Sequence, residues 1–324
     1  MTRTGLVLGA GGVLGAAWTI GALAALEQVR GVEPRESDLL VGTSAGSVLA
    51  AFLGSGVGVD VLLDHQRGIV NAEAPDISFD PDVDSGGALP PLPRPGIGSA
   101  RGVLSTARRP WKVPPMGALP AVLPRGRGSL DPIGNLVDAV CPRGAWAGHP
   151  ATWIVAMDVD RSRRVVFGRD GAPHASLRDA VMASCAIPGW YAPVRIGRRS
   201  YVDGGVCSPT SLDLVASLGL DEVVVLSPMT SLDYDRPTTV TGRMERRFRR
   251  IVTARLIREV KKVAATGTRV TLLGPGAEDL AVIGTNMMDP RRREQVLETS
   301  LRTSAVALRS GPRGASPPGF AAAG

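Results

Sequence analysis

Short apolar runs alternate with longer amphipathic or alanine-rich segments along the first 60 residues of the chain. Residues 5–8 predict a short buried strand, and residues 13–29 predict a helix that ends just before Gly31. The next strand is predicted at 38–43 and the next helix at 45–56. This order predicts parallel strands joined by right-handed crossovers, and therefore an α/β sheet that is covered on both faces.

The second half of the chain contains the same two kinds of segment. Strands are predicted at 151–160, 163–168, 222–228 and 269–275, with a hairpin-like strand pair over 194–206. Helices are predicted at 176–187, 243–263 and 290–308. We therefore expect a single α/β domain over residues 1–309, which is long enough to bury a full core.

Residues 71–130 break this pattern. They hold 11 of the 26 prolines and eight of the 40 glycines, and no helical or alternating period persists in them. Such an insertion is either a flexible surface excursion or a lid over a cleft, and its place after the helix behind Ser44 favours a lid. The tail, residues 310–324, is rich in Gly, Pro and Ala and is expected to be disordered.

Composition and charge narrow the function classes. The formal net charge of +7 suits nucleic acid, an anionic membrane surface or simple solubility, but only 4% of residues are aromatic and the sequence contains no nucleic-acid module. Three cysteines without metal-ligand spacing indicate thiols of a reducing, cytoplasmic compartment. They are Cys141, Cys185 and Cys207. The uncharged stretch 4–26 contains six glycines, which disfavour a signal or membrane-spanning helix.

One pentapeptide carries candidate chemistry. Residues 42–46, Gly-Thr-Ser-Ala-Gly, match the G-x-S-x-G elbow and stand between a predicted strand and a predicted helix. Gly42 and Gly46 leave room for a sharp turn, and the helix behind Ser44 directs its positive end at any oxyanion formed there. We expect Ser44 to be a nucleophile rather than part of a purely structural turn.

A serine that transfers acyl groups also needs hydrogen-bond donors for the oxyanion. The loop Gly9–Gly15 leads into the first helix, and we expect the amides of Gly11 and Gly12, with Ala10 as a further candidate, to donate. The same glycines would suit an NAD(P)-binding oxidoreductase, although their spacing departs from the strict fingerprint. The elbow one βα unit later favours the oxyanion hole.

The partner of this serine is not predicted to be a histidine. His65, His149 and His174 lie in no motif, and we expect them to be surface or helix-capping residues. Asp203 follows a β-rich run in Tyr-Val-Asp-Gly-Gly, where the end of a strand projects its carboxylate into a cleft. The alternative is that this Asp-Gly sequence only forms a turn.

Four separated segments together resemble the patatin-like phospholipases, serine acylhydrolases that use a Ser-Asp dyad. They are the oxyanion loop at 9–15, the elbow at 42–46, the ASCAIPGWYAP segment at 183–193 and the acid motif at 203–205. The resemblance implies a three-layer α/β/α fold with a mainly parallel central sheet. It also implies Ser44 as nucleophile, Asp203 as base with Gly204 and Gly205 beside it, a lipid acyl ester as substrate, and no metal or other cofactor.

Two positions depart from the family's loop. Leu14 stands where arginine or lysine is common, and Ala10 stands where glycine is usual. A missing basic residue weakens the expectation of phospholipid preference more than that of ester hydrolysis. It also leaves open a patatin-like protein that binds lipid without catalysis.

A strongly basic segment follows the motifs. Residues 243–262 hold nine Lys or Arg and two Glu. The apolar side chains of the predicted helix approximate one face, and they are Met244, Phe248, Ile251, Val252, Leu256, Val260 and Val263. The helix either packs on the sheet with a solvated basic side or docks peripherally on anionic lipid headgroups.

Overall fold

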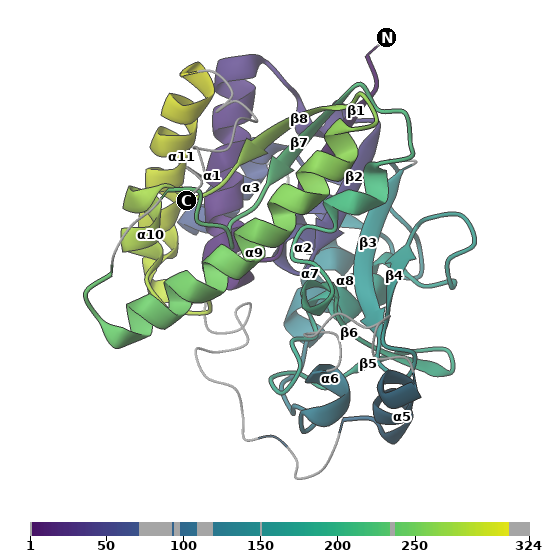
Figure 1. The fold of residues 1–324 in the computed structure, drawn as a ribbon. Helices are drawn as coiled ribbons and strands as arrows, with labels where there is room; N and C mark the ends of the chain where they lie inside the picture. Colours follow the sequence, from purple (N-terminus) through teal and green to yellow (C-terminus); the bar gives the residue numbers. More distant parts are fainter. Residues whose placement is uncertain are drawn as a thin grey trace.

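A mixed β-sheet with helices on both faces forms the centre of the molecule (Figure 1). The computed structural model describes residues 2–70, 93, 98–108, 119–149, 151–233 and 237–310. The strands run in the order β5-β6-β3-β2-β1-β7-β8, and β4 also pairs with β3. They are β1 (Thr4–Leu8), β2 (Leu39–Thr43), β3 (Thr152–Asp158), β4 (Arg163–Phe167), β5 (Val194–Ile196), β6 (Arg199–Asp203), β7 (Glu222–Leu226) and β8 (Arg269–Leu273).

The sheet is parallel in its larger part and antiparallel at one end. Strand β1 pairs in parallel with β2 and β7, β2 pairs with β3, and β7 pairs with β8. The antiparallel pairs join β3 to β4, β3 to β6 and β5 to β6. The predicted fold class and the hairpin-like pair are therefore confirmed.

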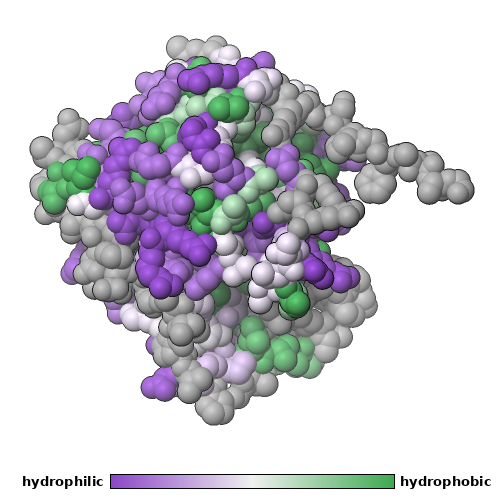
Figure 2. All heavy atoms as spheres, turned by 90° about the vertical axis from the view of Figure 1, so that its left-hand side faces the viewer, coloured by the Kyte–Doolittle hydropathy of each residue, from purple (hydrophilic) through white to green (hydrophobic). Residues whose placement is uncertain are grey.

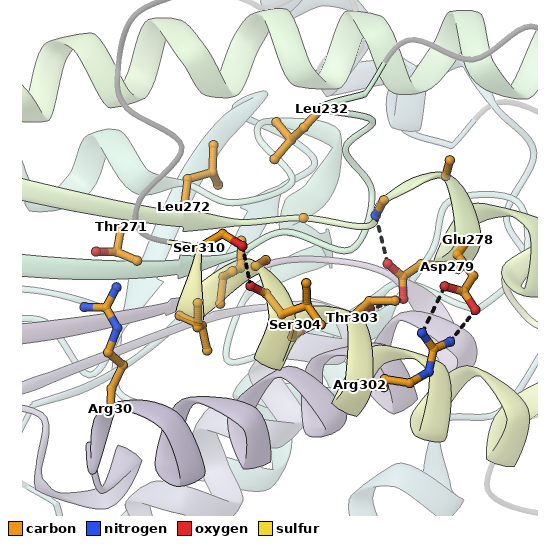
Figure 3. A pocket seen from close by; sticks show the side chains of 17 residues that line it. Arg30, Leu232, Thr271, Leu272, Glu278, Asp279, Arg302, Thr303, Ser304 and Ser310 are labelled. Carbon is orange, nitrogen blue, oxygen red and sulfur yellow. Dashed lines mark hydrogen bonds and ion pairs between the residues drawn. The ribbon is translucent and has the colours of Figure 1, made fainter.

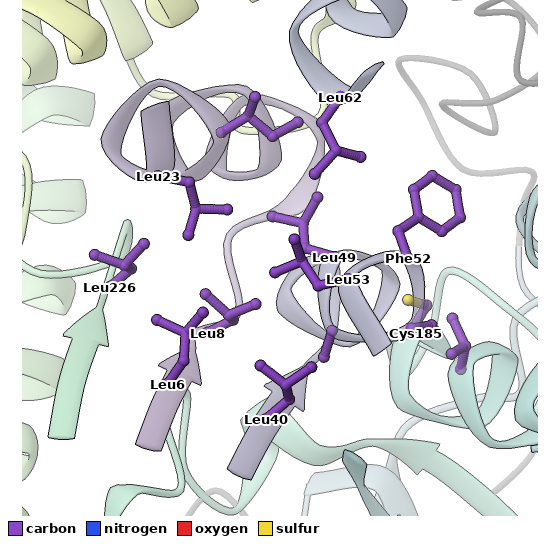
Figure 4. Close-up of a cluster of buried hydrophobic side chains, with 14 of the residues drawn as sticks. Leu6, Leu8, Leu23, Leu40, Leu49, Phe52, Leu53, Leu62, Cys185 and Leu226 are labelled. Carbon is purple, nitrogen blue, oxygen red and sulfur yellow. The ribbon is translucent and has the colours of Figure 1, made fainter. Parts of the chain in front are cut away.

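The two faces of the sheet carry separate cores. Leu6 and Leu8 of β1 point into the larger core, together with Leu40 and Leu49 (Figure 4), whereas Val7 packs in a second core on the other face. The larger core lies under α1 (Gly12–Arg30), α2 (Ala45–Gly54), α3 (Val59–Arg67), α7 (Asp131–Val140), α8 (Leu177–Cys185), α10 (Ala277–Ile283) and α11 (Arg293–Arg309). The second core lies under α9 (Val240–Ala264).

Helix α1 is the predicted first helix and ends, as predicted, at Gly31, whose φ is 62°. It is the one helix in the described part of the chain that is long and apolar enough to cross a membrane, and 67% of its apolar stretch is buried within the fold. It packs along α11, and a side chain at Gly21 would collide with the backbone of that helix. The molecular face that includes α10 and α11 is mainly hydrophilic, with small separate apolar patches (Figure 2).

The insertion at 71–130 contains more regular structure than predicted. Helices α5 (Ala100–Arg108) and α6 (Leu119–Val122) lie within it. The hydroxyl of Ser99 donates to Asp160 over 2.7 Å, so this part packs beside the turn between β3 and β4. Residues 71–92, 94–97 and 109–118 of the insertion and the tail from 311 onward lie outside the described residues.

Helix α9 forms where predicted, but the prediction of its apolar face was partly wrong. Met244 and Ile251 are 70% and 59% exposed, whereas Arg249 and Glu259 are buried. The reason is that both buried charges find partners in the loops beneath the helix, as described below. The spacing of apolar residues along the helix cannot predict these partners, because they lie far away in the sequence.

Candidate active site

The pairing along β3 brings the candidate serine and carboxylate together. Strand β2 pairs with residues 152–155 of β3 and β6 with residues 156–158, while β4 runs along residues 154–158. Since β4 pairs along one side of β3, both β2 and β6 pair along its other side. They occupy successive parts of that side and run toward each other. Their ends, Thr43 and Asp203, therefore meet, and Ser44 follows Thr43 directly.

The elbow holds Ser44 in a backbone conformation that serine rarely adopts. Ser44 directly precedes the first residue of α2, and its backbone angles are φ 54° and ψ −125°. Such strain costs about 1–3 kcal/mol and persists where the surrounding structure imposes it. A side chain at Gly42 would collide with α2, and one at Gly46 with the carbonyl of Leu8. The two glycines allow the helix to approach β1 and β2 closely enough to fix the turn.

A serine that the sequence analysis did not single out fastens the elbow from α8. Ser184 accepts a hydrogen bond from the amide of Ser44 at 2.9 Å and donates to the carbonyl of Val155 at 2.6 Å. Two residues further on, the carbonyl of Ala186 accepts from the amide of Asp203 at 3.0 Å. The segment 183–193 thus contacts Ser44 and Asp203 at once. Its presence among the four motifs was the signal in the sequence that could have identified Ser184.

Asp203 lies in a site from which water is largely excluded. Its side chain accepts a hydrogen bond from the amide of Gly205 at 2.7 Å. Ser44 and Asp203 are only 5% and 6% exposed. Burial raises the pKa of Asp203 to about 6, although the neighbouring Ser44 hydroxyl and the Gly205 amide act to lower it. The carboxylate is therefore a stronger base than in water and remains ionised at neutral pH.

The glycine loop lies beside this pair, but only part of it offers free donors. A side chain at Gly205 would touch Ala10, which places the loop next to the acid motif. The amides of Gly11 and Gly12 have no acceptor among the described residues. The amide of Ala10 donates to the carbonyl of Pro209 at 2.7 Å, so, unlike the other two candidate donors, it already has an acceptor.

Ser44 lines an apolar cavity of about 110 Å³. Gly12 and Met288 border it beside the loop, and its other lining residues are Val13, Ala16, Ile20, Ala45, Val48, Leu49, Phe52, Leu62, His65, Gln66, Ile133, Leu136, Cys185, Ile187 and Tyr191. The lining includes none of the residues of 71–130 that the structure describes, and the expected lid stays a prediction, because most of that segment lies outside the described residues. Helix α7, which the sequence analysis did not predict, contributes to the lining.

The histidine prediction holds for His174, which is exposed. His149 is half-buried and accepts from the amide of Ala151 just before β3, so it caps no helix. His65 is buried and lines the cavity, because α3 turns this side of its helix inward. Burial, with the charge of Arg293 nearby, lowers the pKa of His65 to about 4. The hydrogen bonds of Ser44 are made with Ser184, which accepts from its amide, and with Ser47, which donates to its carbonyl.

A larger cavity, about 290 Å³, lies between β8, α10 and α11 (Figure 3). Two of its charged groups, Arg302 and Glu278, pair with each other, and Asp279 accepts from the hydroxyl of Thr303 and from the amide of Gly276. It contains none of the four motif segments. In the part of the chain that the structure describes, no three His, Cys, Asp or Glu side chains gather where they could hold a metal ion.

The sequence profile of the patatin-like phospholipase family matches residues 6–216. The chain belongs to the patatin-like phospholipase family. Among solved structures it is similar to VipD from Legionella pneumophila, with 14% identity and a TM-score of 0.46 over 96% of this chain and 67% of that one. Membership in this patatin-like family implies a hydrolase that acts on lipid acyl esters, and it sets aside the dinucleotide-binding alternative for the Gly9–Gly15 loop.

The structure accounts for one departure from the patatin-like loop. Leu14 is fully buried in the larger core, where a basic side chain would lack water. Its amide donates to the carbonyl of Met287 at 2.9 Å. The loop is therefore held by segments from the C-terminal third of the chain rather than by a charge of its own.

Proposed function

We propose that this protein hydrolyses lipid acyl esters through an acyl-enzyme on Ser44, with Asp203 as the base. The buried Asp203 carboxylate next to the equally buried Ser44 hydroxyl carries the proposal. The apolar cavity beside Ser44 supports an acyl chain as the group that is bound there. The strained elbow supports attack by Ser44 on the ester carbonyl carbon, and the two free loop amides support stabilisation of the charge that develops on the carbonyl oxygen.

The proposed reaction has two halves. The Ser44 oxygen attacks the ester carbonyl while its proton passes to Asp203, and the amides of Gly11 and Gly12 bind the oxyanion. Collapse of this intermediate releases the alcohol, which takes the proton from Asp203. Water then attacks the acyl-enzyme with Asp203 again as base, and the fatty acid leaves as Ser44 regains its proton.

Labelling with a fluorophosphonate tests this function, since it reacts with activated serines. We expect one adduct on Ser44 in the wild type, no adduct in Ser44→Ala, and loss of acyl-ester hydrolysis to the background rate in that variant. Ser47→Ala serves as a control for a neighbouring serine in the same helix. Lipid binding without an adduct or turnover would instead support a non-catalytic lipid-binding protein.

We further propose that the first half of α9 docks on anionic membrane. Val240, Met244 and Ile251 are exposed and recur on one side of the helix, with Arg247 and Arg250 beside them. Arg249 binds the carbonyl of Pro228, just past the carboxyl end of β7. This half of α9 therefore lies near the carboxyl ends of the parallel strands, where Ser44 follows β2. An apolar stripe flanked by arginines suits a lipid interface and would bring the cavity toward its substrate.

A further inference from the structure

Helix α9 contributes two buried charges that reach the segments behind the oxyanion loop. Arg249 and Glu259 lie ten positions apart on the side of α9 that faces the protein. Both belong to the part of the chain beyond residue 216, where the family profile no longer matches. Buried charges are costly unless well paired, so their contacts indicate what they stabilise.

Arg249 holds two segments that touch the loop. It donates to the carbonyls of Pro228 and Thr230 at 2.6 and 3.2 Å and to the sulfur of Met287 at 3.0 Å. Its guanidinium also pairs with Glu245. A planar fork of donors can hold two separate segments in one geometry, which an ammonium cannot do.

Pro228 and Met287 in turn contact the loop directly. A Cβ at Gly11 would lie 2.6 Å from the Pro228 ring, so that ring packs against the loop backbone. The carbonyl of Met287 accepts from the amide of Leu14 at 2.9 Å and lies beside Gly12. Arg249 therefore holds the two groups between which Gly11 and Gly12 are seated.

Glu259 holds the other side of the loop through the segment after the acid motif. Its carboxylate accepts from the hydroxyls of Ser208 and Thr210 at 2.7 and 3.0 Å and from the amide of Leu212 at 3.1 Å. Pro209, which lies between them, accepts the amide of Ala10 at 2.7 Å. Because of this hydrogen bond the amide of Ala10 is not free, and the directions of the following amides of Gly11 and Gly12 are fixed.

We propose that Arg249 and Glu259 are positioning residues that hold the oxyanion loop, so that the amides of Gly11 and Gly12 point at the reacting carbonyl. This inference rests on the proposed function of Ser44. It also gives α9 a catalytic purpose that is separate from its exposed basic side. Neither side chain touches substrate in this account.

Kinetics with a short-chain, water-soluble ester test the proposal without a membrane step. We expect Arg249→Gln to lower kcat about 10- to 100-fold with KM changed less than about twofold, because a misplaced donor weakens transition-state binding. Affinity for a trifluoromethyl ketone, which forms an oxyanion on Ser44, should fall in proportion to kcat/KM. Arg249→Lys should recover part of the loss, and Glu259→Gln should lower kcat about tenfold.

Arg246→Gln is the matched control, because Arg246 is also buried on this side of α9 and pairs with Glu245. Wild-type kcat and ketone affinity in folded Arg249→Gln, or an equal loss in Arg246→Gln, would overturn the proposal. If Arg249→Gln does not fold, Glu245→Gln combined with Arg249→Met removes both charges, and the same losses are expected.

Amide hydrogen exchange over residues 9–15 provides a readout that needs no turnover. We expect exchange there to become at least about tenfold faster in Arg249→Gln but not in Arg246→Gln. If the wild type forms no Ser44 adduct, the proposed function fails while the exchange result still decides whether Arg249 holds the loop. Unchanged exchange together with unchanged kinetics refutes the positioning role.

Discussion

Asp203 shows how one side chain combines function with a cost to stability. Its carboxylate is buried next to the Ser44 hydroxyl, and burial raises its pKa to about 6. The folded protein therefore binds this proton more tightly than the unfolded chain does, so the free energy of unfolding decreases as pH rises from about 4 through 6. A base is gained at neutral pH at the expense of stability.

Asp203→Asn should separate these two effects. We expect hydrolysis to fall about 100-fold or more, because the base is lost. The melting temperature at pH 8 should rise, corresponding to about 1–3 kcal/mol, because no buried charge remains. Activity profiles and thermal melts at pH 5 and pH 8 measure both. A less stable Asp203→Asn protein at pH 8 would contradict the cost assigned to the carboxylate.

His65 allows a direct test against a histidine mechanism, since it lines the same cavity as Ser44. Wild-type kcat/KM should fall below about pH 6 as Asp203 takes up its proton. We expect His65→Gln to keep this acidic limb and at least about one tenth of the activity, since the general base is unchanged. Disappearance of the limb in His65→Gln, with activity lost, would identify His65 as the base.

At the scale of elements, the site depends on how α8 and the strand ends are joined. Ser184 links the elbow to β3, and Ala186 links the same segment to Asp203. The three connections run through the last turn of α8 and the residue that follows it. The element thus sets the separation of nucleophile and acid, although neither residue belongs to it.

Ser184→Ala should reduce both stability and rate. It leaves the amide of Ser44 and the carbonyl of Val155 without this partner, which we expect to cost about 1–3 kcal/mol of unfolding free energy and to lower kcat about tenfold. Ser300→Ala is the matched control, because that buried serine donates to the carbonyl of Trp18 at 2.6 Å. Denaturant unfolding and kinetics should show equal destabilisation in both variants but loss of kcat in Ser184→Ala alone.

At the scale of the whole molecule, α9 faces two environments. One side fastens the loops behind the site, and the other presents exposed Val240, Met244 and Ile251 among arginines. The net charge of +7 favours approach to anionic surfaces in general. A defined docking surface differs from this general attraction in that binding depends on where the basic residues lie and not only on the net charge.

Charge reversal at two places on α9 separates these contributions. Arg247→Glu with Arg250→Glu should lower partition onto vesicles with 30% anionic lipid at least about tenfold, because each basic residue near such a surface contributes about 1 kcal/mol. Lys261→Glu with Lys262→Glu makes the same change of net charge at the far end of the helix and should have less effect. Cosedimentation at low and high salt measures both, and equal losses would contradict a defined docking face.

The amino-acid sequence by itself determined the local shapes: the elbow around Ser44, the glycine loop, the strand that ends at Asp203 and the layered α/β fold. Each depends on the backbone preferences and apolar period of a few neighbouring residues. Tertiary structure alone decided that β2 and β6 meet along one edge of β3, that His65 is buried, that Pro209 takes the amide of Ala10, and that α9 turns Arg249 inward. These outcomes depend on partners far away in the chain, because burial and hydrogen bonding are satisfied in space and leave no periodic signal in the sequence.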